Sequence, residues 1–140
     1  MKKNIKKTNA ARILDRLNIP YEILTYEVDE NDLSAEHVAS VTGQPLEQTF
    51  KTLVAKGDKT GVLVACIPGG ASLDLKKLAA VSENKKVDLV PLKDVLGLTG
   101  YLRGGCSPLG MKKLYPTFLD DSALQYSSIM VSAGLRGCQL

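Results

Sequence analysis

Two apolar, β-branched runs joined by a short glycine-bounded loop place the strongest constraint on the fold. The runs are TFKTLVAK (49–56) and GVLVACI (61–67), and the loop between them is GDKTG (57–61). Loops of this length and composition connect adjacent antiparallel strands, because glycine and aspartate tolerate the backbone angles of a tight reversal. The sequence therefore predicts a β-hairpin near the middle of the chain.

Helical and extended patterns alternate on either side of this hairpin. Thr8 is a suitable N-cap for a helix that Pro20 ends, and Ser34 is a suitable N-cap for a helix that stops at Gly43. Further elements are expected as a helix at 72–83, a strand at 85–90, a short helix or turn at 92–100, and strands at 21–28 and 127–134. This order predicts an α+β domain built on an antiparallel or mixed sheet.

The composition restricts the class of protein. A chain of 140 residues with 44% hydrophobic residues is expected to form a single domain over 1–140 with a buried core. The basic start MKKNIKKTNAAR lacks the apolar core of a secretory signal, and no apolar run is long enough to cross a bilayer. We therefore expect a cytoplasmic protein. Its net charge of +3 is compatible with nucleic-acid contact but does not demonstrate it.

The common catalytic and metal-binding motifs are absent from the sequence. The three cysteines are distant from one another and share a single histidine, His37, which argues against a disulfide framework and a metal site. His37 is expected on the solvated surface of its helix, and no other residue offers a base for a serine or cysteine nucleophile. We expect no cofactor. Lysines occur as pairs that could contact phosphates, although such pairs are more often a solvated face: Lys76/Lys77, Lys85/Lys86, Lys112/Lys113 and the N-terminal Lys2, Lys3, Lys6 and Lys7.

Lys51 is the most informative residue of the predicted hairpin. Alternation along a strand places Lys51 with Leu53 and Ala55, and the opposite face is equally apolar. An ammonium group in such a strand needs either a route to solvent along its stem or a bound anion. Lys51 is thus either a lysine that extends to solvent at a strand end or a charge that holds an anionic or carbonyl group.

The segment GYLRGGCSPLG (100–110) is too rich in glycine for a helix or a regular strand. Gly104 and Gly105 would let a ligand approach the main chain closely and would present N–H donors to an oxygen. A sharp connecting loop is the alternative interpretation. Ser132 adds a hydroxyl next to the flexible backbone of VSAGLRG, at the end of the last predicted strand.

Four segments together carry a resemblance to a known family. TNAARILDRLNIPYEILTYE, FKTLV, GYLRGGCSPLG and VSAGLRG, in this order and spacing, resemble the YbaK/ProX/EbsC family of aminoacyl-tRNA deacylases. The resemblance implies a barrel-like, mostly antiparallel β-sheet with flanking helices. It also implies roles for individual residues. Lys51 matches the family's essential lysine, followed by Thr52; Tyr26 matches a pocket tyrosine, Gly104 the loop glycine at the aminoacyl end, and Ser132 the pocket serine.

The same resemblance implies a function. Free-standing members of the YbaK type clear cysteine mischarged onto the tRNA for proline, and a related domain is inserted in bacterial prolyl-tRNA synthetases. The substrate's own thiol would attack its ester and leave as a cyclic thiolactone, so that Lys51 and backbone N–H groups need only orient the substrate and stabilise the oxyanion. Family members usually continue beyond the last motif. This sequence ends at Leu140, so we expect either an incomplete chain or a differently closed sheet.

Several alternatives remain open at this point. The misacylated amino acid could be alanine, the domain could bind an aminoacyl or nucleotide group without turnover, or Cys106 could serve as the reactive thiol of a hydrolase or redox protein. The residues do not distinguish which tRNA is preferred, whether prolyl-tRNA synthetase is a partner, or the oligomeric state.

Overall fold

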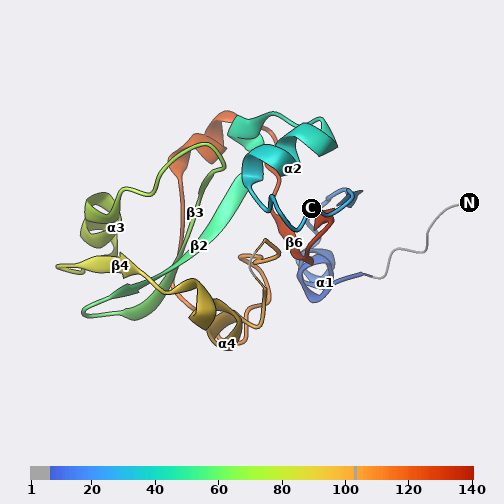
Figure 1. The fold of residues 1–140 in the computed structure, drawn as a ribbon. Helices are drawn as coiled ribbons and strands as arrows, with labels where there is room; N and C mark the ends of the chain where they lie inside the picture. Colours follow the sequence, from blue (N-terminus) through green and yellow to red (C-terminus); the bar gives the residue numbers. More distant parts are fainter. Residues whose placement is uncertain (1–6, 103) are drawn as a thin grey trace, which may run out of the picture.

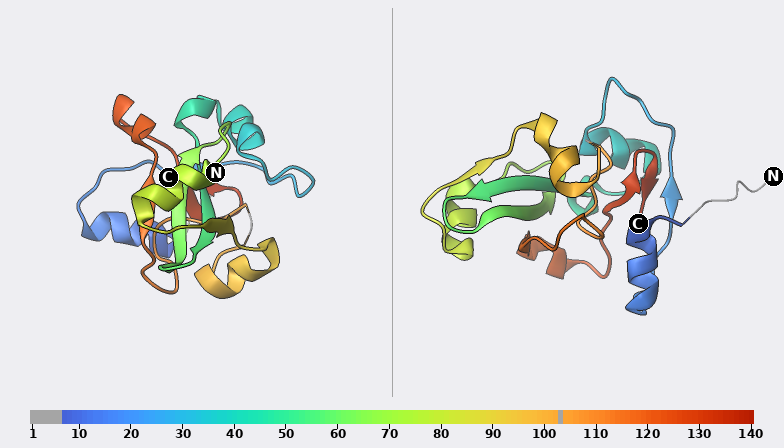
Figure 2. Two further views of the ribbon diagram at one scale, coloured as in Figure 1. Left: turned by 90° about the vertical axis from the view of Figure 1, so that its left-hand side faces the viewer. Right: turned by 90° about the horizontal axis from the view of Figure 1, so that it is seen from below.

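The computed structural model describes residues 7–102 and 104–140, and Figure 1 shows how the elements of this part of the chain are arranged. Their order is α1 (Asn9–Arg16), β1 (Leu24–Thr25), α2 (Ala35–Thr42), η1 (Leu46–Gln48), β2 (Phe50–Gly57), β3 (Gly61–Pro68), α3 (Leu75–Ser82), β4 (Val87–Leu89), η2 (Leu92–Asp94), α4 (Val95–Thr99), β5 (Thr117–Leu119), η3 (Asp121–Gln125), β6 (Ser132–Leu135) and β7 (Cys138–Gln139). The α3 and β4 elements lie at one end of the β2–β3 hairpin, and α1 and β6 lie at the other (Figures 1 and 2).

The predicted hairpin is confirmed. β2 and β3 pair antiparallel along their whole length, from Phe50 opposite Pro68 to Gly57 opposite Gly61. The Asn84 side chain holds the turn, because its Oδ1 accepts hydrogen bonds from the backbone N–H groups of Lys59 (2.8 Å) and Thr60 (3.0 Å). A hydrogen-bonded turn of this kind fixes the register of the two long strands.

The hairpin contributes to two hydrophobic clusters, one on each face. Ala55, Leu63 and Ala65 pack with Leu78 and Ala79 of α3 on one face. Phe50, Val64 and Cys66 form the cluster on the other face, with partners from the C-terminal third of the chain: Met111, Tyr115, Ala123, Ile129 and Val131. This central sheet has the order β4-β2-β3-β5, and β5 joins it in parallel to β3.

A second sheet has the order β1-β7-β6 and packs against α1. Ala10 and Ala11 of α1 are buried in a cluster with Ala133 and Cys138. The two sheets are linked at Met130, whose carbonyl accepts a hydrogen bond from Phe50 N (2.8 Å) while its own N–H donates to Gln48 O (2.7 Å). The segment before β6 therefore joins the second sheet to the N-terminal end of β2.

The predicted helix caps are confirmed. Thr8 caps α1 by accepting a hydrogen bond from Ala11 N, and Ser34 caps α2 by accepting one from His37 N. Gly43 follows α2 with a φ of 71°, in the left-handed region that glycine enters at little cost. The helix predicted before Pro20 is shorter than the pattern allows, since it ends at Arg16.

The α+β class is confirmed, whereas the strands at both ends of the chain are shorter than predicted. The strand predicted at 21–28 is reduced to Leu24–Thr25, because its partner β7 has only two residues. The strand predicted at 127–134 becomes an isolated bridge between Met130 and Thr49 followed by β6. The sheets are mostly antiparallel, but those of the described residues do not close into a barrel. No helix in the described ranges has the length and apolar character needed to span a membrane.

Candidate functional site

A cavity of about 340 Å³ opens beside the N-terminal half of β2. It lies between the start of α2, the edge of β2, the β4–α4 connection and the glycine-rich loop. Four of the six predicted site residues line this cavity, namely Lys51, Thr52, Gly104 and Ser132, whereas Tyr26 and Gly105 do not. The fold thus brings together residues that are up to 81 positions apart in the sequence.

Lys51 lies on β2 opposite Ile67 and is half-buried. None of the ion pairs among the described residues includes it. Its ammonium group therefore has no protein carboxylate to neutralise it, and it can interact with an anionic or carbonyl group in the cavity. Among the described residues that line the cavity, Glu36 is the acidic one.

Thr52 follows Lys51 and belongs to the opposite face of β2. Thr52 lines the cavity, and its hydroxyl lies 3.8 Å from the Cys66 sulfur, so a small polar group lies on an otherwise apolar sheet face. Ser132 is buried at the start of β6, and its hydroxyl accepts a hydrogen bond from Gly134 N (3.1 Å). Because the Ser132 hydroxyl accepts this bond, its own proton is available to donate to a ligand.

The two adjacent glycines of the loop have different positions. Gly104 lines the cavity with a φ of +83°, and a Cβ there would lie 3.2 Å from Cβ of Leu33. Gly105 is buried outside the lining, and a Cβ there would lie 2.9 Å from the backbone nitrogen of Arg136. Close packing against the β6–β7 turn therefore explains the glycine at 105, whereas Gly104 keeps the cavity open.

Tyr26 lies just after β1, and its N–H donates a hydrogen bond to Gly137 O (3.0 Å). Its side chain is half-buried, and it is outside the cavity lining. The predicted role of Tyr26 as a pocket residue therefore has no support from this arrangement. The pattern LTYE could not reveal this, because the position of the residue depends on pairing with the far end of the chain.

Cys106 lines the cavity, but its environment disfavours a nucleophile. Burial raises the pKa of its thiol to about 11, with a smaller contribution from nearby Cys66. A thiol with this pKa is protonated at neutral pH, whereas nucleophilic cysteines have lowered pKa values. Among the described residues of the lining, the other ionisable side chains are Glu36 and Lys51, and the single histidine of the sequence, His37, is not one of the lining residues and so offers no base for Cys106.

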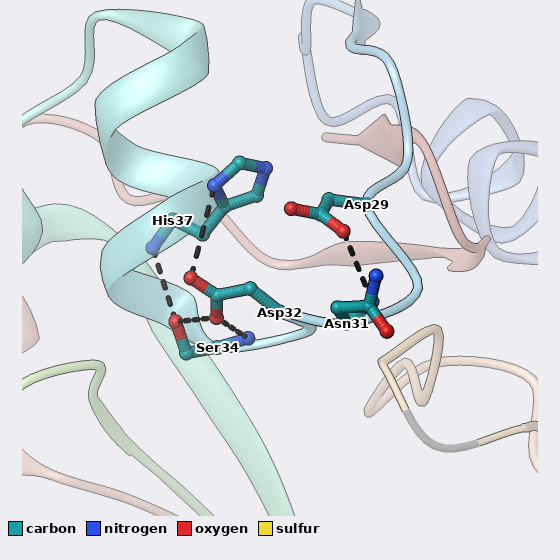
Figure 3. Close-up of polar contacts among 5 residues, drawn as sticks. All are labelled: Asp29, Asn31, Asp32, Ser34 and His37. Carbon is teal, nitrogen blue, oxygen red and sulfur yellow. Dashed lines mark hydrogen bonds and ion pairs between the residues drawn. The ribbon is translucent and has the colours of Figure 1, made fainter.

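The start of α2 forms one wall of the cavity and was read from sequence only as a helix cap. Figure 3 shows its polar contacts: Asp32 accepts hydrogen bonds from the N–H and the hydroxyl of Ser34, and its Oδ2 lies 3.9 Å from His37 Nδ1. The hydroxyl contact is the main cause of the lowered pKa of Asp32. His37 is half-buried rather than solvated as predicted, with a side chain 23% exposed. These bonds fix the loop that presents Leu33 and Ser34 to the cavity.

Apolar side chains form the remaining wall, and sequence analysis did not single them out. They come from the segment that runs from the end of β4 to the start of α4: Leu89, Val90, Leu92 and Val95. Leu89 and Leu92 are half or more exposed, so they form an apolar rim. The lysine pairs lie outside the lining, and Lys2, Lys3 and Lys6 lie outside the described residues. The described residues contain no cluster of ligands suited to a metal ion.

Comparisons with known proteins define the class to which this fold and cavity belong. Residues 29–140 match the family described as the aminoacyl-tRNA editing domain, and the chain belongs to this family. The sequence is 53% identical over 139 residues to the protein named "Putative Cys-tRNA(Pro)/Cys-tRNA(Cys) deacylase EbsC" of Enterococcus faecalis, covering 99% of this chain and 85% of that protein. It is also 27% identical to a proline–tRNA ligase of Thermosipho africanus over 76% of this chain and 18% of the ligase.

Solved structures share the fold. The crystal structure of hypothetical protein APE2540 matches with a TM-score of 0.82 at 20% identity, covering 91% of this chain and 83% of that one. A structure described as a "putative trans-editing enzyme for prolyl tRNA synthetase" matches with a TM-score of 0.76 at 24% identity, covering 94% of this chain and 83% of that one. The predicted family and fold are thereby confirmed.

Proposed function

We propose that this protein is a trans-editing deacylase that removes cysteine from tRNA(Pro) mischarged with it. Its family and its 53% identity to a protein named as a deacylase of Cys-tRNA(Pro) and Cys-tRNA(Cys) support this substrate. The observation that carries the mechanism is the chemistry of the cavity, which combines one unpaired lysine with a neutral thiol and no histidine base. The nucleophile is then supplied by the substrate.

In this mechanism the cysteine side chain of the substrate attacks the carbonyl carbon of its own ester. A C–S bond forms, the ester C–O bond breaks, and the thiol proton is transferred to the departing ribose oxygen. The products are deacylated tRNA and a cyclic thiolactone. Holding the thiol near the carbonyl is the main contribution of the cavity, and the Lys51 ammonium stabilises the negative charge that develops on the carbonyl oxygen.

The partner of this reaction is the misacylated tRNA, and its site of action is the cytoplasm. Association with prolyl-tRNA synthetase is a further part of the proposal, supported by the likeness of this chain to a segment of prolyl-tRNA ligases. A trans-acting enzyme would gain from such an association, because the mischarged product would be edited before it is released.

The test compares cysteinyl-, seryl- and alanyl-tRNA(Pro) at the same concentration and at catalytic amounts of enzyme. We expect rapid multiple-turnover loss of cysteine and a far slower loss of serine, which differs from cysteine by one atom. Trapping the thiolactone would identify the route directly. Equal rates for serine and cysteine would show that the nucleophile is not the substrate thiol, and faster loss of alanine would show that alanine is the preferred substrate.

A further inference from the structure

The edge of β2 that faces the cavity has a specific pattern of backbone groups. In an antiparallel sheet, the N–H and C=O of one residue point to the same neighbouring strand, and successive residues alternate. Thr49 O accepts a hydrogen bond from Gly69 N (2.8 Å), directly after β3, so the odd-numbered residues face β3. Phe50 N donates to Met130 O and Val54 O accepts from Val90 N (3.1 Å), so the even-numbered residues face away from it.

Thr52 lies midway between these two bonded positions. Its N–H and C=O therefore both point away from β3, toward the side where the cavity lies. β4 pairs only with Ala55–Gly57, because after Val90 the chain enters η2 at Pro91 and leaves the sheet. Within 7–102 and 104–140, no backbone group pairs with Thr52 on this edge.

The stretch of this edge that has no paired strand is short. Strands rise about 3.3 Å per residue, so Phe50 and Val54 are about 13 Å apart. Met130 occupies the edge at one end and Val90 at the other. Such a gap accommodates one hydrogen-bonded residue opposite Thr52, and a longer peptide strand would overlap Met130 or Val90.

We propose that the aminoacyl group of the substrate binds as this one residue, paired antiparallel with Thr52. This inference rests on the proposed function. An extended aminoacyl ester directs its α-ammonium group and its carbonyl oxygen to the same side, as a strand residue does. The ammonium group donates to Thr52 O, and Thr52 N–H donates to the ester carbonyl oxygen. This N–H adds a second oxyanion donor to the Lys51 ammonium in the same cavity.

The pairing also fixes where the substrate side chain lies. Residues directly opposite each other in an antiparallel pair project to the same face of the sheet. An L-amino acid paired with Thr52 therefore places its side chain on the face that holds the Thr52 hydroxyl and Cys66. A D-amino acid in the same pairing would direct its side chain to the opposite face. Main-chain pairing thus makes the site selective for the L configuration and for a free α-amino group.

The test is amide hydrogen exchange measured by NMR on the full chain. The probe is L-cysteine joined through a stable amide to 3′-amino-3′-deoxyadenosine, and the control probe carries 3-mercaptopropionate, which has the thiol but no α-amino group. At saturation with the cysteinyl probe, we expect exchange of Thr52 N–H to slow at least tenfold. The N–H groups of Lys51 and Leu53, which already face β3, should change little. Thr52→Val preserves the backbone and should preserve this protection.

A second measurement uses turnover and does not depend on probe affinity. We expect 3-mercaptopropionyl-adenosine to be cleaved with a kcat/KM at least tenfold below that of cysteinyl-adenosine, after each is corrected for its uncatalysed rate. Saturable binding without protection of Thr52 N–H, or equal kcat/KM for the two esters, would overturn the pairing and leave the proposed function standing. Failure to cleave Cys-tRNA(Pro) at all would overturn the proposed function as well.

Discussion

Lys51 is the residue on which the proposed chemistry depends most. Lys51→Ala should reduce deacylation of Cys-tRNA(Pro) by at least about a hundredfold, the scale for losing one oxyanion donor. The fold should be unaffected, because the ammonium group makes no ion pair with the described residues. Single-turnover rates measure the effect, with circular dichroism to verify folding. Lys59→Ala, which removes an exposed lysine of the β2–β3 turn that belongs to none of the lysine pairs, is the matched control. A folded Lys51→Ala enzyme with near-normal rates would contradict the assignment.

The loop residues Gly104 and Cys106 should differ sharply in their tolerance to substitution. Gly104→Val should abolish activity, because a branched side chain would meet Leu33 across the cavity and a φ of +83° is strained for valine. Cys106→Ser should retain most activity, since the Cys106 thiol is protonated at any pH well below about 11. Steady-state assays between pH 7 and 9 test both variants. An inactive, folded Cys106→Ser enzyme would place the nucleophile on the protein.

At the scale of elements, the β2–β3 turn depends on a single side chain. Asn84 is buried, and it also donates hydrogen bonds to Thr60 Oγ1 (3.0 Å) and Ser82 Oγ (2.8 Å). Asn84→Ala leaves the N–H groups of Lys59 and Thr60 without this acceptor, so we expect a loss of about 2–3 kcal/mol in the free energy of unfolding. Urea denaturation measures it. Asp74→Ala, which removes the exposed cap of α3, is a control expected to cost only about 1 kcal/mol.

The elements also show which features a sequence can reveal. The hairpin and the caps at Thr8, Ser34 and Gly43 depend on interactions within a few residues, and all were predicted. The two-residue strands β1 and β7 depend on pairing between opposite ends of the chain, and no local pattern encodes it.

The same distinction separates the site residues. Lys51 could be recognised because a charged residue is unusual in a strand with two apolar faces, and Gly104 because glycine is so frequent in its loop. Thr52 was predicted only from the family resemblance. The position of Gly105 against Arg136, and of Tyr26 beside Gly137, is set by tertiary packing. The apolar rim at Leu89 and Leu92 was missed for a related reason, since leucines near a strand end usually indicate core rather than a cavity wall.

At the scale of the whole molecule, the distribution of charge bears on how tRNA binds. Those of the paired lysines that the structure describes are on the surface, and two of them form ion pairs: Lys7 with Asp15 at 2.8 Å and Lys86 with Asp88 at 3.7 Å. If these lysines contact phosphates, kcat/KM for Cys-tRNA(Pro) should fall steeply between 50 and 200 mM salt, because each neutralised phosphate releases counterions. Cleavage of cysteinyl-adenosine, which lacks the tRNA phosphates, should change much less. An equal salt response for both substrates would exclude the lysine pairs from tRNA binding.

The link at Met130 has a consequence for the order in which the protein is made. Gln48 and Phe50 are both hydrogen-bonded to Met130, so one boundary of the gap beside Thr52 is absent while the first two-thirds of the chain emerges from the ribosome. During that interval the edge of β2 has more than one open position and can pair with strands of other nascent chains. Once Met130 has been synthesised and has bonded to Phe50, only the position beside Thr52 remains unpaired on this part of the edge. Folding of the C-terminal third should therefore both complete the proposed substrate site and limit aggregation through β2.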